Sequence, residues 1–125
     1  MEIDIPDFIN KEIFDELLLI NQDDSTFLKD LITMYLDQAL DIINNLYNFV
    51  KSRNFEEVFK HSHKFKGSSV SIGLINVGLS CEKIENLILN SSNLSNDNIF
   101  IEVTKELVLL ETYFNQAKDF LLKFI

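Results

Sequence analysis

Hydrophobic residues recur at intervals of three and four along most of the chain, which is the spacing of one face of an α-helix. The C-terminal stretch shows this best, with apolar residues at Phe100, Val103, Leu107, Leu110, Phe114, Ala117, Leu121 and Phe124. The alternation of apolar and polar residues that marks β-strands is hard to find. The pattern therefore predicts an all-α fold.

Polar residues that favour helix ends divide this pattern into segments. Asn10 is placed to cap a short first helix, and the run from Gln22 to Ser25 predicts a turn that ends in a new cap. Asn54 and Glu57 have the spacing of a capping box, and Gly73 suits the end of that helix. The predicted helices cover 11–20, 25–53, 54–72 and 74–90, followed by a last helix that carries the stripe ending at Phe124.

Four long amphipathic helices and a short leading one predict an up-down antiparallel four-helix bundle with an extra N-terminal helix. Only three glycines and one proline interrupt the chain. We expect a single domain over 1–125. Its core should include the apolar stripe of the second helix, which is Leu28, Ile32, Tyr35, Leu36, Ala39, Ile43, Leu46 and Val50.

Charge and composition narrow the classes of function. The formal net charge of −9 disfavours binding to nucleic acid or to an anionic membrane surface. One cysteine and two histidines supply neither a disulfide framework nor a zinc cluster. The chain opens without a basic start or an apolar signal segment. We therefore expect a cytoplasmic protein, with entry into the nucleus left open.

One histidine of the third helix falls on the side away from its apolar stripe. At about 100° per residue, His63 points opposite the stripe that Val58 and Phe65 help to form. We expect His63 to face water and His61, beside the stripe, to be half covered. The ordinary interpretation of an exposed histidine is solvated surface.

The neighbours of His63 favour a more specific interpretation. Gly67 lies one turn further on, at a mid-helix position where glycine costs about 1 kcal/mol relative to alanine. Its missing side chain clears an approach to the imidazole, and Lys66 places a cation beside the same ring. An exposed nucleophile with a cleared approach and a nearby cation suits phosphoryl chemistry.

The residues from His63 to Ser69 read His-Lys-Phe-Lys-Gly-Ser-Ser. This segment resembles the phosphorylation motif of histidine-containing phosphotransfer (HPt) domains, His-x-hydrophobic-Lys-Gly-Ser-Ser. The resemblance covers about residues 8–89, and this part of the chain is similar to the fungal phosphorelay intermediates. The last helix resembles them only in its amphipathic character.

The resemblance implies that His63 accepts a phosphoryl group from a receiver-domain aspartate of a hybrid histidine kinase and passes it to a response regulator. It implies that Lys66 stabilises the phosphoryl oxygens, that Gly67 admits the receiver's active-site loop, and that Ser68 forms hydrogen bonds within the site or back to its helix. Glu85 stands near the site where fungal relatives often carry glutamine. A carboxylate there can accept a hydrogen bond from imidazole but cannot donate one to phosphate.

The second helix has more apolar surface than its core stripe uses. The family binds receiver domains through a hydrophobic patch on the first two helices, and the corresponding residues are Ile13, Leu17, Phe27, Leu31 and Gln38. The alternative is that this patch is buried internally, with the first helix capping the bundle. The family picture also implies a monomer.

The sequence contains no glycine-rich nucleotide-binding loop. The resemblance accordingly implies a phosphohistidine carrier and not an enzyme in its own right. It needs no cofactor of its own, because Mg²⁺ is expected in the partner receiver domain. Two other interpretations are a helical adaptor that binds receivers without phosphotransfer, and a metal-carboxylate bundle, whose paired Glu-x-x-His motifs the sequence lacks.

Overall fold

The computed structural model describes residues 3–125 and confirms the all-α prediction. Residues 1 and 2 of the domain expected over 1–125 lie outside the described part. The helices are α1 (Lys11–Asp23), α2 (Phe27–Lys51), α3 (Phe55–Ser71), α4 (Ile75–Leu89) and α5 (Asn96–Leu121), with short 3₁₀ turns at Ser91–Asn93 and Leu122–Phe124.

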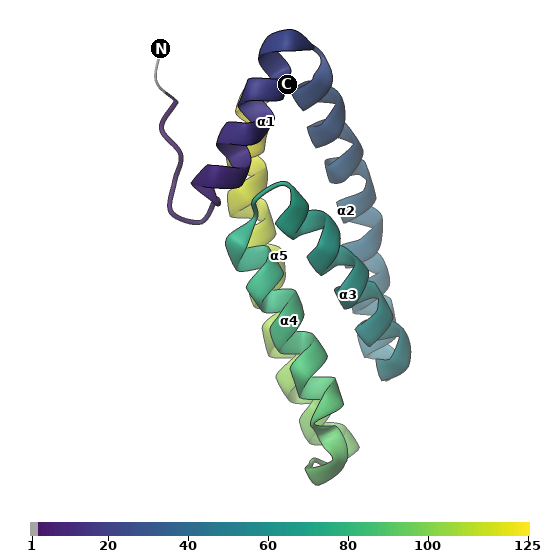
Figure 1. Cartoon of the computed structure of the whole chain (residues 1–125). Helices are drawn as coiled ribbons and strands as arrows, with labels where there is room; N and C mark the ends of the chain where they lie inside the picture. The colour runs from purple at the N-terminus through teal and green to yellow at the C-terminus, as the bar shows by residue number, and fades with distance from the viewer. Residues whose placement is uncertain (1–2) are drawn as a thin grey trace.

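The four long helices form an up-down antiparallel bundle (Figure 1). In that view α2 descends, α3 returns upward, α4 descends and α5 rises again. Each long helix packs against two others, in the cycle α2–α3–α4–α5–α2. The short α1 lies at the upper end, beside the C-terminal part of the chain. The predicted architecture is therefore confirmed, including the extra N-terminal helix.

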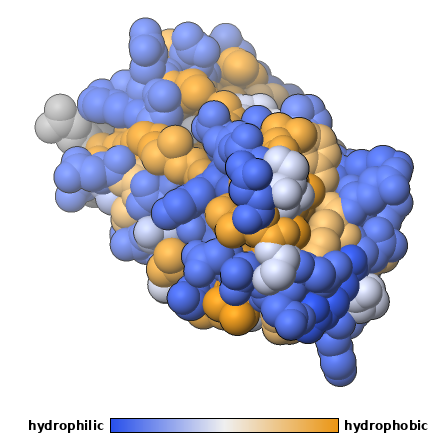
Figure 2. Space-filling model, turned by 90° about the horizontal axis from the view of Figure 1, so that it is seen from below, coloured by the Kyte–Doolittle hydropathy of each residue, from blue (hydrophilic) through white to orange (hydrophobic). Residues whose placement is uncertain are grey.

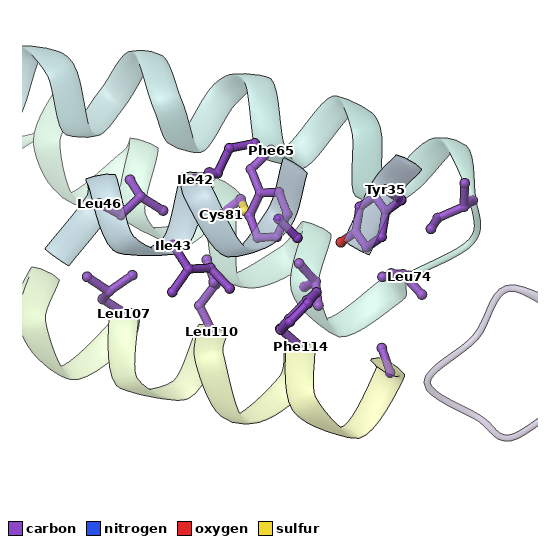
Figure 3. Close-up of a cluster of buried hydrophobic side chains, with 14 of the residues drawn as sticks. Tyr35, Ile42, Ile43, Leu46, Phe65, Leu74, Cys81, Leu107, Leu110 and Phe114 are labelled. Carbon is purple, nitrogen blue, oxygen red and sulfur yellow. The ribbon is translucent and has the colours of Figure 1, made fainter. Parts of the chain in front are cut away.

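Aromatic rings form the centre of the core (Figure 3). Tyr35 stacks on Phe65 with ring centroids 5.9 Å apart, and both rings lie 6.2 Å from that of Phe114. At the upper end, Phe14 of α1 packs against Phe120 with centroids 5.1 Å apart. Since Phe14 is the one fully buried residue of α1, this contact anchors the short helix on α5.

The predicted stripe of α2 is correct except at one position. Leu36 is only half-buried, whereas Ile42, which the stripe left out, is buried. The reason is that α2 packs against both α3 and α5 and therefore buries a wider arc than a single line of residues.

The turn between α1 and α2 differs from the prediction, because Ser25 is not the cap of the second helix. The first helix continues three residues further than expected. The Asn21 side chain accepts a hydrogen bond of 3.0 Å from the backbone N–H of Leu28, and Asp24 accepts one of 3.3 Å from that of Thr26. A side chain of α1 thus satisfies an N–H in the first turn of α2, a task usually left to the cap residue.

The turn between α3 and α4 is held by the segment that precedes α1. Gly73 has φ +89°, a left-handed conformation that suits glycine, and its carbonyl accepts a hydrogen bond of 2.7 Å from the N–H of Asn10. Ile9 and Leu74 form an isolated antiparallel bridge. We call residues 8–10 the N-terminal strap. It ties the start of α1 to the end of α3.

Hydrophobic side chains also reach the surface. Seen from below, they appear as separate patches among hydrophilic residues (Figure 2). Among the described helices, none combines the length and apolar character needed to cross a bilayer.

Candidate functional site

The structure confirms the predicted exposure of the two histidines. The His63 side chain is 66% exposed, while Val58 and Phe65 of the same helix are buried. The ring of His61 is half-buried, and its Nδ1 lies 2.9 Å from the backbone carbonyl oxygen of Glu57. His63 is therefore the histidine that another molecule can reach.

A carboxylate from α4 orients the His63 ring. Nδ1 of His63 lies 3.3 Å from Oε2 of Glu85, whose side chain is only 8% exposed. Because an ionised carboxylate can only accept, Nδ1 is the protonated nitrogen and the lone pair of the neutral ring lies on Nε2. Within residues 3–125, Nε2 makes no hydrogen bond. Since the side chain is largely exposed, this lone pair is not used inside the described part of the chain.

The same carboxylate also holds Lys66. The Nζ atom of Lys66 lies 3.2 Å from Oε1 of Glu85 and 3.4 Å from Oε2. This cation compensates a carboxylate that is almost fully withdrawn from water, where an unpaired charge would be costly. Glu85 thus brings the imidazole and the ammonium group together. The sequence predicted the contact with the imidazole but not the ion pair with Lys66.

Gly67 borders open space. A Cβ atom placed there would have no neighbour within 4 Å other than its two chain neighbours and its own helix backbone. This corrects one detail of the prediction: the glycine does not relieve crowding of the His63 ring, because that ring lies beyond 4 Å as well. The bare backbone instead leaves free surface beside His63 that a partner can approach.

Phe59 is a neighbour of His63 that sequence reasoning did not assign to the site. Its ring is nearly parallel to the imidazole, at an angle of 6° and a centroid distance of 6.3 Å. The two residues are one helical turn apart, and this spacing was the available signal. Phe59 provides an apolar wall on one side of the ring.

The two serines of the motif have structural partners. Ser68 donates a hydrogen bond of 3.2 Å to the carbonyl of Phe65, the bond back to its own helix that was one of its two expected roles. Ser69 is buried, and its hydroxyl lies 2.7 Å from that of Tyr35. Ser69 therefore belongs to the core.

A shallow hollow between α2 and α3 contains part of the predicted docking patch. Its volume is about 130 Å³. The lining residues are Leu31, Met34, Tyr35, Gln38, Ser68, Ser71 and Ile72. The structure thus brings the predicted Leu31 and Gln38 together with Ser68 of the motif.

The other residues of the predicted patch are half-buried and lie outside the lining of this hollow. Leu17 and Phe27 pack against the core from its edge, and Ile13 is also half-buried. These side chains therefore support the bundle and still reach the surface, so the alternative of a fully buried patch is wrong for them. Their role in docking stays a prediction.

Residues 3–125 contain no group of three or more His, Cys, Asp or Glu side chains placed to share a metal ion. The single cysteine, Cys81, is buried in the core.

Comparisons with known proteins show the family of the chain. The Hpt domain family model matches residues 30–120. The phosphorelay intermediate protein YPD1 of Saccharomyces cerevisiae is 34% identical over 82 residues, which are 65% of this chain and 49% of that protein. Multistep phosphorelay regulator 1 of Schizosaccharomyces pombe is 28% identical over 123 residues, which are 93% of this chain and 42% of that protein. The chain spans about half the length of the curated relatives it matches.

Solved structures give the same result for the fold. The Saccharomyces cerevisiae histidine phosphotransfer signaling protein Ypd1, crystallised with the receiver domain of its downstream response regulator Ssk1, has a TM-score of 0.85 and 26% identity, covering 97% of both chains. A histidine-containing phosphotransfer protein from maize has a TM-score of 0.78 and 22% identity, covering 94% of this chain and 85% of that one. The family match covers most of the bundle and includes the helix that carries His63, so the chain belongs to the Hpt domain family.

Proposed function

We propose that the chain is a phosphorelay intermediate. His63 accepts a phosphoryl group from the receiver aspartate of a hybrid histidine kinase and passes it to the receiver aspartate of a response regulator. The observation that carries this proposal is the exposed side chain of His63, with Nδ1 held by the buried Glu85. The names of the relatives support the class of reaction, and the complex of Ypd1 with a receiver domain supports the class of partner.

The transfer balances as a simple exchange of bonds. The lone pair on Nε2 attacks phosphorus, an N–P bond forms, and the P–O bond to the receiver aspartate breaks with the electron pair leaving on its carboxylate. Nδ1 keeps its proton, so the phosphorylated ring gains positive charge. The carboxylate of Glu85, 3.3 Å from Nδ1, stabilises that charge, and the onward transfer reverses these steps.

Lys66 and Gly67 act on the incoming group. The ammonium of Lys66 is paired with Glu85 before transfer, and it turns to the phosphoryl oxygens when they arrive. Gly67 leaves room for the receiver's active-site loop, since nothing in the chain occupies the place of its side chain. Ser68 keeps its hydrogen bond to the helix backbone.

The receiver docks over the hollow between α2 and α3, where Leu31 and Gln38 lie, and extends toward the half-buried apolar residues of α1. Such a patch with a polar rim is typical of a partner site. The chain supplies one half of the reacting site and acts as a carrier, not as an enzyme by itself. The acidic cluster and its Mg²⁺ belong to the receiver. In this proposal the chain is a monomer in the cytoplasm, and its access to the nucleus is left open.

A phosphotransfer assay tests this function. The chain is mixed with a phosphorylated receiver domain and Mg²⁺, and the label on it is tested for the acid lability and base stability of phosphohistidine. The expected result is label on wild type and on His61→Gln, but none on folded His63→Gln. Label retained by His63→Gln would overturn the site. Absence of label from several receivers that still bind the folded chain would favour the adaptor function instead.

A further inference from the structure

A second groove lies between α4 and α5, away from His63. Its volume is about 180 Å³. The lining residues are Asn76, Leu79, Ser80, Lys83, Glu106, Leu109 and Tyr113. None of these residues has a role in the proposed phosphotransfer.

The groove contains a buried carboxylate. The side chain of Glu106 is 7% exposed and accepts a hydrogen bond of 2.6 Å from the hydroxyl of Ser80. Its other oxygen lies 3.4 Å from Nζ of Lys83. Burying a carboxylate without a cation costs folding free energy, so a positive partner stabilises Glu106.

The present cation is held weakly. Lys83 is 69% exposed, and an ion pair with such an exposed side chain contributes little, because water and salt screen the interaction. The ammonium can therefore return to solvent if a better cation arrives. Glu106 itself stays in place, because it lies between two packed helices and is bonded to Ser80.

The groove is separate from the phosphotransfer site. Lys83 and Glu85 are neighbours in sequence but point about 160° apart around α4, since successive residues of a helix are turned by about 100°. Glu85 faces α3 and His63, and Lys83 faces α5. A molecule in the groove would leave the surface around His63 free.

The walls of the groove are apolar. The large apolar side chains of Leu79 and Leu109 are exposed, and the half-buried Tyr113 adds an aromatic ring. Apolar walls above an acidic floor match a side chain with an aliphatic stem and a cationic end. The net charge of −9 also attracts a basic partner.

We infer that the α4–α5 groove binds an arginine side chain presented by a partner protein. The guanidinium replaces Lys83 on Glu106, and the methylene stem packs between Leu79 and Leu109. Arginine fits better than lysine because its guanidinium is less strongly hydrated, binds a carboxylate with two parallel hydrogen bonds, and stacks on aromatic rings such as Tyr113.

Two matched peptides test this inference. The probes are acetyl-Leu-Arg-Leu-amide and acetyl-Leu-Gln-Leu-amide, titrated into the ¹⁵N-labelled full chain and followed by amide chemical shifts. The arginine peptide is expected to shift the amides of Ser80, Lys83 and Glu106 saturably, while those of His63 and Gly67 stay in place. The glutamine peptide is expected to bind at least about tenfold more weakly. Equal binding of both peptides, or no saturable shift, would overturn the inference.

Two variants supply the controls. Lys83→Ala removes the internal competitor on the surface and is expected to tighten binding of the arginine peptide severalfold. Glu106→Gln keeps an acceptor for Ser80 but removes the charge, and is expected to weaken binding by about tenfold. An unchanged or weaker affinity in Lys83→Ala would contradict the exchange of cations, even if Glu106→Gln failed to fold. Both variants are expected to accept phosphoryl groups at the wild-type rate, which separates this inference from the proposed function.

Discussion

Nδ1 of His63 lies 3.3 Å from Oε2 of Glu85, so a buried carboxylate of one helix determines which nitrogen of an exposed histidine on the neighbouring helix carries the free lone pair. The sequence shows the two residues 22 positions apart, and only the packing of α3 on α4 brings them together.

Replacing Glu85 by glutamine should slow phosphorylation without unfolding the bundle. The amide oxygen still accepts a hydrogen bond, but it lacks the charge that stabilises the positive ring and holds Lys66. A charged acceptor is worth about 1 kcal/mol more than a neutral one, so the rate should fall about fivefold to tenfold. The ring ¹⁵N shifts of His63 should show a larger share of the Nδ1-unprotonated tautomer. A slower rate with unchanged tautomer populations would contradict the positioning role.

Lys66→Ala should slow transfer, because the phosphoryl oxygens lose their nearest cation. The matched control is Lys64→Ala, which removes an exposed lysine next to His63 in sequence that makes no ion pair in the described residues. Initial rates of labelling from one phosphorylated receiver measure both variants. Equal rates for the two would remove Lys66 from the mechanism.

Gly67→Ala should make the protein more stable and less active. Alanine is favoured over glycine inside a helix by about 1 kcal/mol, and apart from its chain neighbours and its own helix backbone the added methyl group has nothing within 4 Å. The same methyl group should obstruct the receiver and slow transfer. Gly78→Ala is the control, and its stability should change in the opposite direction. Its Cβ would lie 2.7 Å from Cγ2 of Val70 and should destabilise the packing of α3 on α4. Thermal unfolding and transfer rates test both; a Gly67→Ala variant of full activity would contradict the role given to this glycine.

The buried pair of Tyr35 and Ser69 should behave non-additively. Their hydroxyl groups lie 2.7 Å apart inside the bundle, and burial raises the pKa of Tyr35 far above its usual range. Either Tyr35→Phe or Ser69→Ala leaves the other hydroxyl unpaired and should reduce the free energy of unfolding by about 1–3 kcal/mol. The double variant should lose less than the sum. Urea unfolding of all four proteins measures the coupling, and strict additivity would show that the hydrogen bond contributes nothing.

The Cys81 thiol should be inert in the folded protein. Burial, with a further contribution from the negative charge of Glu85, raises its pKa from 9.0 to about 12. A thiol reagent such as dithionitrobenzoate should therefore react at pH 8 only after urea is added. Between about pH 9 and pH 12 the unfolded chain releases the thiol proton and the folded chain keeps it, so stability should fall as the pH rises. Fast labelling without urea would show that the core opens around Cys81.

The sequence was enough to predict what a helix determines by itself. The spacing of three and four residues predicted the five helices and the exposure of His63, because both depend on how residues are placed around one axis. It was not enough for relations between helices. Which residue of α4 lies opposite Lys66 depends on the offset of α3 and α4 along their axes. The hydrophobic repeat of each helix does not contain that information.

The cap of α2 shows the same limit. Ser25 has the right residue type and position for a cap, yet Asn21 on the preceding helix satisfies the N–H of Leu28. The partner of Ser68 was predictable, since a serine inside a helix has few acceptors within reach, whereas Ser69 bonds to Tyr35 of another helix. The stacking of Phe59 on His63 depends on two rotamers, which spacing alone does not determine.

The N-terminal strap has a consequence for the order of folding. It joins Ile9 to Leu74, whereas the hairpins of α2 with α3 and of α4 with α5 close short loops. Contacts between distant parts of a chain form late, and α1 buries only Phe14 completely. The strap and α1 should therefore dock last and exchange their amide hydrogens before the bundle does. The short helix that is proposed to help receive a partner would then open and close while the helix bearing His63 remains folded.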